Sequence, residues 1–269
     1  MFEDLVKYWK EAGISLKEEK DSYIHPKDEA IKEYENGQQI DYPIYLHTDL
    51  YPEPYNGDLS NPKIVFLYLN PGFNEQDYEV KMIMRQKLIN ALNQDFDNNE
   101  EYPFCWLDEE YKDKPKDENP GAFYWNKLFD QKNKGNSFLE NLAKDEEFNR
   151  KHVDTRKWLA QHVCDIELFP YHSKTFTGKK AEKLTNICES SKIAKTAVMD
   201  AIDKHKEIMF VFMRSIKLWI PDEKERNRIL NSSNVILNPY PQNPTLNPNT
   251  TKDFGIILLT FLTEQGGSN

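Results

Sequence analysis

The order of apolar and polar positions predicts strands separated by helices. Apolar runs typical of strands buried on both faces occupy Lys63–Leu69, Val163–Phe169, Ile208–Met213 and Val235–Leu237. Apolar residues at helical spacing predict helices over 77–92, 155–161, 194–202, 215–220 and 253–264. The last of these is apolar on all sides, so we expect it to be buried. The alternation predicts an α/β fold, with helices on both faces of a parallel sheet.

The rest of the chain suggests how this core is extended. The first forty residues suit one or two amphipathic helices, and the proline-rich segment 41–62 suits an ordered, extended arm. We expect a single domain over 1–269, with N-terminal helices and an arm at 1–62 and an α/β core at 63–92 and 153–265. Residues 93–135 are expected to form an insertion, ordered by its aromatic side chains.

Composition supports a globular protein with a sizeable core. The chain has 269 residues, of which 38% are hydrophobic and 13% aromatic. No apolar stretch is long enough to span a membrane and no basic start resembles a secretory signal, so we expect a cytoplasmic protein. The three cysteines are widely spaced (Cys105, Cys164 and Cys188), which argues against a disulfide scaffold or a structural zinc site.

Charge is distributed unevenly along the chain. The net charge of -10 argues against a protein that coats nucleic acid through charge alone. Residues 1–150 carry 18 basic and 32 acidic side chains, whereas residues 151–269 carry 17 and 13. A contact with DNA or a nucleotide is therefore expected on the C-terminal half, unless these lysines simply form solvated helix faces. The candidates are Lys174, Lys179, Lys180, Lys183, Lys204, Lys206, Arg214 and Lys217.

Ligands of parallel α/β sheets bind outside the carboxyl ends of the strands, which selects four loops. After the first strand, Asn70 offers an amide that can donate and accept, and Gly72 allows close approach to the backbone, although Asn-Pro-Gly is also a common turn. After the second strand, His172 is a candidate proton donor or phosphate contact, or an ordinary loop histidine. After the third, Arg214 could hold a phosphate or a carboxylate such as Glu167.

Two acidic residues lie within the second strand. Asp165 and Glu167 are two residues apart and therefore share one face. Because a buried carboxylate needs a partner, they are either salt-bridged to a covering helix or serve in ligand binding or as a general base. After the fourth strand, Asn238, Tyr240, Gln242 and Asn243 occupy a proline-stiffened loop that suits clamping a planar ligand, or that simply crosses the sheet.

Together these motifs resemble the uracil-DNA glycosylase-like superfamily. The resemblance is carried by Leu69-Asn70-Pro71-Gly72-Phe73, Asp165-Ile166-Glu167-Leu168-Phe169-Pro170 and Asn238-Pro239-Tyr240-Pro241. Pro52-Glu53-Pro54-Tyr55 and Tyr102-Pro103-Phe104-Cys105-Trp106-Leu107-Asp108 are similar to a bacterial group within it. The resemblance implies an αβα sandwich around a four-stranded parallel sheet. It also implies extrusion of a base from nucleic acid and hydrolysis of its N-glycosidic bond without metal or other cofactor.

The resemblance also implies roles for individual residues. Asn70 would orient the attacking water, and Phe73 or Phe104 would stack on the extruded base. The loop 238–243 would hold the flanking backbone through residues such as Gln242 and stabilise negative charge on the departing base. Asn238 or Asn243 would replace the histidine of the usual second motif. Arg214 stands where the family often has a small residue.

The base itself is not defined by the resemblance. Asp165 stands where many members have an asparagine that recognises uracil, and an ionised carboxylate only accepts hydrogen bonds. The leading hypothesis is a protein that recognises a nucleobase in DNA or a nucleotide and hydrolyses its glycosidic bond. The alternatives are a non-catalytic module that binds nucleotides, modified bases or a protein, and a different hydrolase that uses Asp165 or Glu167 as its base.

Overall fold

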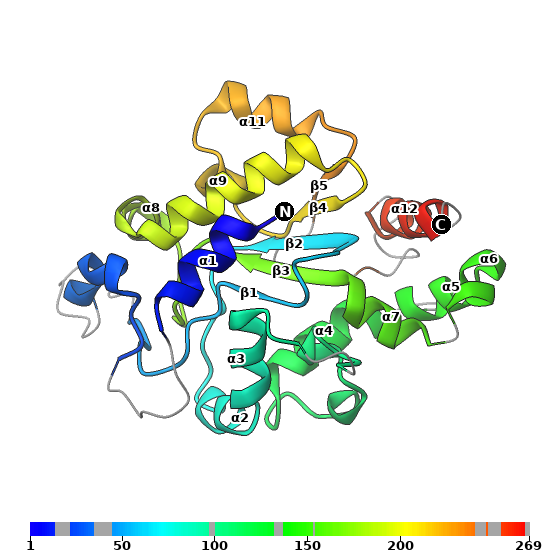
Figure 1. Cartoon of the computed structure of the whole chain (residues 1–269), viewed down its shortest axis with the longest axis horizontal. Coiled ribbons are helices and arrows are strands. Elements are labelled where there is room, and N and C mark those ends of the chain that lie inside the picture. Colours follow the sequence, from blue (N-terminus) through cyan, green and yellow to red (C-terminus); the bar gives the residue numbers. More distant parts are fainter. Residues whose placement is uncertain are drawn as a thin grey trace.

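The centre of the structure is a five-stranded sheet in the order β1-β3-β2-β4-β5 (Figure 1). The computed structural model describes residues 1–13, 22–34, 45–96, 100–131, 137–152, 154–239, 246 and 254–266. Within them the strands are Tyr55–Asn56 (β1), Ile64–Tyr68 (β2), Val163–Glu167 (β3), Met209–Phe212 (β4) and Val235–Leu237 (β5). The predicted α/β class is confirmed, and β2 to β5 form at the four predicted runs.

The sheet has one more strand than expected, because the proline-rich arm adds β1 to its edge. β1 pairs antiparallel with β3, while β3, β2, β4 and β5 are parallel. The arm turns away at Gly57, whose φ is +90°. A Cβ at this position would lie 2.5 Å from the carbonyl oxygen of Val163, so only glycine fits this approach. The expected sheet of four parallel strands is therefore corrected to a mixed sheet of five.

Helices cover both faces of the sheet. Figure 1 shows α8, α9 and α11 on one side of the strands and α2, α3 and α4 on the other. The helices preceding β3 are α1 (Glu3–Glu11), the 3₁₀ helix η1 (Pro26–Tyr34), α2 (Asp77–Ile83), α3 (Arg85–Asn93), the 3₁₀ helices η2 (Cys105–Leu107) and η3 (Glu109–Tyr111), α4 (Pro120–Asp130), α5 (Phe138–Lys144), α6 (Glu146–Lys151) and α7 (Thr155–His162). Those after β3 are α8 (Gly178–Ile187), α9 (Glu189–Lys204), α10 (Ile216–Trp219), α11 (Glu223–Leu230) and α12 (Phe254–Gly266).

Strand alternation creates two separate apolar cores. Val65 and Leu67 of β2 pack with α1, α8 and α9, and we call this side the α9 face. Ile64 and Phe66 pack with η2, α4 and α7, and we call this side the α4 face. Because successive side chains of a strand point to opposite faces, each residue of β3 can be assigned to one of them.

Two helices differ from their sequence-based expectations. The helix predicted over 77–92 is divided at Met84, whose ψ of 4° ends α2 before α3 begins at Arg85. The closing helix α12 is only half-buried, since Leu258 is inaccessible while Ile256 and Ile257 are 47% and 44% exposed. The expectation of complete burial was therefore wrong, because an apolar composition does not itself supply a neighbour on every side.

The described part of the expected insertion belongs to the core of the α4 face. Phe104, Trp106 and Trp125 are buried there, and Trp125 lies edge-on to Phe66 of β2 with ring centroids 5.5 Å apart. Asn119 caps α4 by accepting a hydrogen bond from the backbone N–H of Ala122. The segment thus supplies the layer that covers one face of the sheet.

Candidate functional site

The loops after β2 and β3 meet at the carboxyl edge of the sheet, as the topology predicts. The Asn70 Nδ2 group donates to the backbone oxygen of Ser173 at 3.2 Å and to its Oγ at 3.1 Å. Asn70 is half-buried. Within the described part of the chain, these are the hydrogen bonds of the Asn70 amide, which leaves Oδ1 to accept one from another group.

His172 follows β3 and is bound on both sides by backbone carbonyl oxygens. Its Nδ1 lies 3.0 Å from the carbonyl oxygen of Gly72, and its Nε2 lies 2.9 Å from that of Tyr51. The side chain is buried, and burial lowers the pKa of His172 to about 3. The expectation that His172 contacts a ligand is therefore corrected. Both ring nitrogens face the protein backbone, and the residue holds the loop after β2 in place.

The tip of the loop after β2 is more accessible. Gly72 has a φ of +75°, and a Cβ built on it would touch no other atom, so its backbone faces open space. The Phe73 ring stacks on His47 and meets Tyr78 edge-on, so one face of this candidate stacking residue is already covered. Phe73 remains only half-buried.

Phe104, the other candidate stacking residue, is a core residue. It is fully buried and lies edge-on to Trp125 at a centroid distance of 4.7 Å. Its backbone N–H donates to the carbonyl oxygen of Ala160. A base could stack on Phe104 only if this layer opened, so in this conformation its expected role is contradicted. An apolar and aromatic segment can form a core as well as a stacking platform, and the sequence does not distinguish the two.

The acidic pair of β3 lies on the α4 face. Cys164 and Ile166 belong to the core of the α9 face, so Asp165 and Glu167 point to the opposite side, in register with Phe66 and Tyr68. The carboxylate of Asp165 accepts a hydrogen bond of 2.9 Å from the backbone N–H of Asn56. Burial raises the pKa of Asp165 to about 7.

Glu167 is buried without a partner for one of its oxygens. Its side chain is 8% exposed, and Oε2 is inaccessible and makes no hydrogen bond. Burial and the neighbouring Asp165 raise the pKa of Glu167 well above its usual range, while Arg214 and Lys81 oppose the shift. A salt bridge to a covering helix, the simplest expectation for this residue, is not present among the described residues.

Lys81 of α2 and Glu53 of the arm form a buried ion pair beside these acids. The ammonium group lies 4.8 Å from the centroid of the Trp106 ring. Burial lowers the pKa of Lys81 to about 7, against the attraction of Asp165 and Glu167. Sequence analysis missed both members of the pair. A signal existed for Lys81, which lies three residues before Met84 on an apolar helical stripe.

Two tyrosines lie near the acidic pair. The hydroxyl groups of Tyr68 and Tyr124 lie 2.9 Å apart, joining the end of β2 to α4. Burial raises the pKa of Tyr124 to about 12 and raises that of Tyr68 well above its usual range, so both hydroxyl groups remain neutral. Neutral hydroxyl groups at this position can donate hydrogen bonds to a ligand or to a carboxyl group.

The loops after β4 and β5 contribute Arg214 and Asn238. Arg214 is exposed, and its charge acts on Glu167 and Tyr124, which is consistent with the expected contact to a carboxyl group. Asn238 is buried, and its backbone N–H donates to the carbonyl oxygen of Phe212. The candidates Tyr240, Gln242 and Asn243 lie outside the described residues.

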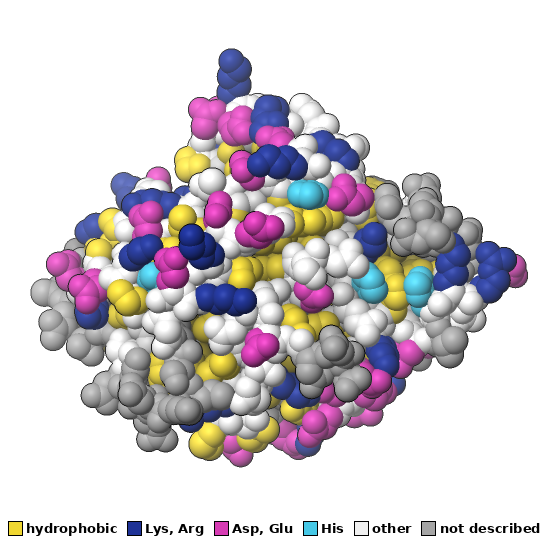
Figure 2. Space-filling model, viewed as in Figure 1, with side chains coloured by type: hydrophobic (Ala, Val, Ile, Leu, Met, Phe, Trp, Pro, Cys, Tyr) yellow, Lys and Arg dark blue, Asp and Glu magenta, His cyan; other side chains and the backbone are white. Residues whose placement is uncertain are grey.

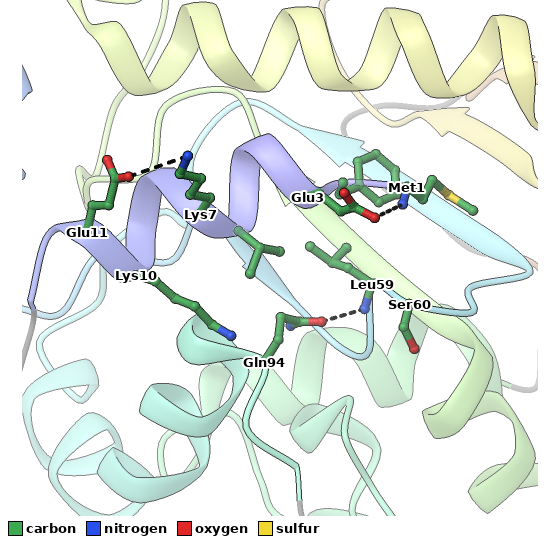
Figure 3. Close-up of a pocket in the computed structure, with 10 residues that line it drawn as sticks. Met1, Glu3, Lys7, Lys10, Glu11, Leu59, Ser60 and Gln94 are labelled. Atoms are coloured by element: carbon green, nitrogen blue, oxygen red, sulfur yellow. Dashed lines mark hydrogen bonds and ion pairs between the residues drawn. The ribbon is translucent and has the colours of Figure 1, made fainter.

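A separate groove lies at the opposite end of the strands. It has a volume of about 690 Å³, and its lining includes Phe2 and Val6 near α1, Leu59 and Ser60 before β2, and Gln94 after α3 (Figure 3). Lys7 is paired with Glu11 at its rim. The groove contains none of the residues predicted from the carboxyl-edge rule.

Three of the six basic side chains of α9 and α11 are paired with acidic side chains. Lys192 pairs with Glu189, Lys204 with Asp200, and Arg228 with both Asp203 and Glu225. Figure 2 accordingly shows lysine and arginine interspersed with acidic side chains on the upper part of this face. For these two helices, the alternative of a solvated charged surface is favoured over a polyanion contact.

Comparison with known protein families, curated proteins and solved structures finds no match to this chain. Within the described residues, no helix has the length and apolarity needed to cross a membrane. The function is therefore inferred from the geometry at the carboxyl edge of the sheet. The residues found on this side of the sheet come from elements distant in the sequence. They are Asn70, the buried acids Asp165 and Glu167, the Lys81–Glu53 ion pair and the exposed Arg214.

Proposed function

We propose that this chain is a uracil-DNA glycosylase-like protein, which recognises a nucleobase in DNA or in a nucleotide and hydrolyses its N-glycosidic bond. The observation that carries the proposal is the position of Asn70. Its Nδ2 group is held by Ser173, and its Oδ1 atom is left to accept a hydrogen bond at the sheet edge where β3 ends with Glu167. The finer likeness to the four-stranded αβα sandwich of that superfamily is part of the proposal.

The reaction needs only water and the substrate. The water oxygen forms a bond to C1′ of the sugar as the bond from C1′ to the base nitrogen breaks. The electron pair of the broken bond goes to the base, which takes up a proton, and the water loses a proton to solvent. Asn70 Oδ1 would accept a hydrogen bond from this water and orient its lone pair, and the products are a free base and an abasic sugar.

The test is an assay for abasic sites on purified protein. The substrates are single- and double-stranded oligonucleotides that carry uracil, hypoxanthine, alkylated bases, or G:T and G:U mismatches. Asn70→Ala should lower the rate at least about a hundredfold, because the water loses its orienting group. Ser173→Ala should have a smaller effect, since the Ser173 backbone oxygen still accepts from Nδ2 at 3.2 Å. Asn227→Ala, an exposed position on α11, is the matched control.

The outcomes separate enzyme from binding module. Product that is lost in Asn70→Ala but kept in Asn227→Ala supports the proposal. Full activity of folded Asn70→Ala would show that the role of Asn70 is wrong. If folded wild-type protein forms no product from any substrate, the glycosylase proposal fails.

A non-catalytic binding module is the second candidate. The burial of Phe104 favours it, because the chain then lacks one of the two aromatic residues expected to stack on an extruded base. Affinity for oligonucleotides that is steeply lowered by salt indicates phosphate contacts, whereas a nucleotide or protein ligand need not show this. Binding without product would favour this second function.

A further inference from the structure

Glu167 has an unusual environment for a buried acid. Its side chain is 8% exposed, and Oε2 is inaccessible and has no hydrogen-bond partner in the part of the chain that the structure describes. The great majority of buried polar side-chain atoms have at least one such partner. An orphaned buried oxygen at the carboxyl edge of the sheet therefore needs an explanation, and a group supplied by a ligand would satisfy it once the side chain rotates toward the small area that it exposes.

The charges around Glu167 come from four elements. Asp165 lies on the same face of β3, and the buried Lys81 of α2 is already paired with Glu53. Arg214 follows β4 and is exposed, so solvent screens its charge. The hydroxyl groups of Tyr68 and Tyr124 are neutral. Burial and Asp165 raise the pKa of Glu167 well above its usual range, which favours the protonated, neutral form of its carboxyl group.

Protonation changes what this side chain can recognise. An ionised carboxylate only accepts hydrogen bonds, whereas a neutral carboxyl group carries one donor and one acceptor side by side. We propose that Glu167 recognises the edge of the bound base by donating one hydrogen bond to it and accepting another from it. This inference rests on the proposed function, because it assigns the specificity of the same site.

The proposal defines a class of base. A matching edge carries a hydrogen-bond donor beside an acceptor. Uracil and hypoxanthine offer a ring N–H beside a carbonyl group, while cytosine and adenine offer an amino group beside a ring nitrogen. Because a carboxyl proton can be on either oxygen, Glu167 fits both arrangements, and the test must separate them.

The position of Glu167 is compatible with access from the Arg214 side. Glu167 keeps a small exposed area, Tyr124 beside it is only half-buried, and Arg214 is exposed at the end of β4. A base at Glu167 would bring its sugar phosphate toward the guanidinium group of Arg214. Arginine binds phosphate through paired donors, so the two residues would divide recognition of base and backbone.

The experiment measures nucleotide binding by calorimetry at pH 6 and pH 8. The probes are the deoxynucleoside monophosphates of uracil, hypoxanthine, cytosine and adenine, with N3-methyl-dUMP as a control that lacks the donor. The proteins are wild type, Glu167→Gln and Glu167→Ala, each checked for folding by circular dichroism. Glu167→Gln keeps a donor and an acceptor at every pH, so it serves as the matched variant. The phosphate titrates equally in all three proteins.

We expect at least one of the four nucleotides to bind, and Glu167→Ala to weaken it about tenfold or more, as loss of a bidentate contact does. Glu167→Gln should bind nearly as tightly as wild type at pH 6. Wherever the wild-type carboxyl group ionises as the pH is raised, its affinity should fall relative to that of Glu167→Gln, because only wild type loses its donor. If dUMP is among the ligands, N3-methyl-dUMP should bind more weakly.

Two results would overturn the role of Glu167 and leave the proposed function standing. The first is wild-type affinity in Glu167→Ala. The second is a loss in Glu167→Gln as large as in Glu167→Ala, which would mean that an ionised carboxylate is required. If no nucleotide binds wild type and no abasic product forms, both the inference and the proposed function fail.

Discussion

Two buried acids on opposite sides of the sheet have opposite surroundings. Asp28 of η1 is fully buried on the side of the α9 face and accepts three hydrogen bonds, from the hydroxyl groups of Tyr8 and Tyr171 and from the backbone N–H of Ser190. Glu167 on the α4 face has an oxygen with no hydrogen-bond partner among the described residues. Asp28 therefore links η1 to α1, α9 and the loop after β3 through its hydrogen bonds. Glu167 has an oxygen that could still accept a hydrogen bond.

This difference indicates that Asp28 stabilises the fold, whereas Glu167 is available for a function. A buried acid whose acceptors are all used contributes to folding, because removing it leaves several donors unsatisfied. A buried acid with an unused oxygen contributes little to folding and is costly to ionise. Such a residue is expected where a ligand completes the hydrogen bonds, and the carboxyl edge of a parallel sheet is where ligands bind.

The largest expected effect is on folding, from Asp28→Ala. This change strands the hydroxyl groups of Tyr8 and Tyr171 and the backbone N–H of Ser190, so we expect the free energy of unfolding to fall by about 4 kcal/mol. Urea denaturation measures it, with the exposed Glu29→Ala on the same helix as control. A loss below about 1 kcal/mol would show that the hydrogen bonds of Asp28 do not hold η1 in place.

Asp165→Asn should change how stability depends on pH. Burial raises the pKa of Asp165 to about 7 in the folded protein, so between about pH 4 and pH 7 the folded state binds more protons than the unfolded state. Its contribution to stability is therefore fully present at low pH and is lost as the pH rises through this window. The wild-type free energy of unfolding should decrease relative to that of the variant by up to about 1.4 kcal/mol per pH unit. Parallel curves would contradict this.

Glu167→Gln should hardly affect stability, in contrast to Asp28→Ala. The amide has the same shape and leaves the orphaned position much as it was, so we expect a change below about 1 kcal/mol at pH 5. As the pH rises, the variant should become more stable than wild type, because it has no proton to lose. Denaturation midpoints at pH 5 and pH 8 measure both effects. A large loss at pH 5 would assign Glu167 the structural role of Asp28.

Arg214→Ala should have the smallest effect. The guanidinium group favours the ionised form of Glu167, so its removal should raise the pKa of Glu167 further, and the effect should be small because the arginine is exposed and screened by solvent. The shift is visible as a displacement of the pH profile of nucleotide binding toward higher pH. Displacement toward lower pH would show that the charge does not act on Glu167.

Sequence alone predicted the parts of this fold that depend on local pattern. Runs such as 163–169 and 235–237 became strands because a continuous apolar stretch suits a strand covered on both faces. The carboxyl-edge rule selected the loops of Asn70 and His172, and the structure joins these loops through the hydrogen bonds of Asn70 to Ser173. What escaped prediction depends on partners distant in the sequence. Glu53 and Lys81 are ordinary surface residue types that become buried only because the arm folds over α2.

Side-chain accessibility was the other limit of sequence reasoning. His172 and Phe104 were expected in the site, yet one is fixed between two backbone carbonyl oxygens and the other lies in the core. Their residue types are compatible with both roles. For His172 the two backbone carbonyl oxygens decide, and for Phe104 the packing of η2 and α4 on the sheet decides. Both depend on contacts between residues distant in the sequence, which local pattern does not show.

The measurement that tests the central claim most directly is the protonation state of Glu167. Infrared difference spectra of wild type and Glu167→Gln, recorded in D₂O across a pH titration, isolate the carbonyl stretch of a protonated carboxyl group at this position. We predict that wild type at neutral pH shows this band, that it disappears only at higher pH, and that the variant lacks it. A carboxylate signal from Glu167 already present at pH 6 would contradict the account, since the side chain would then have no proton to donate to a base.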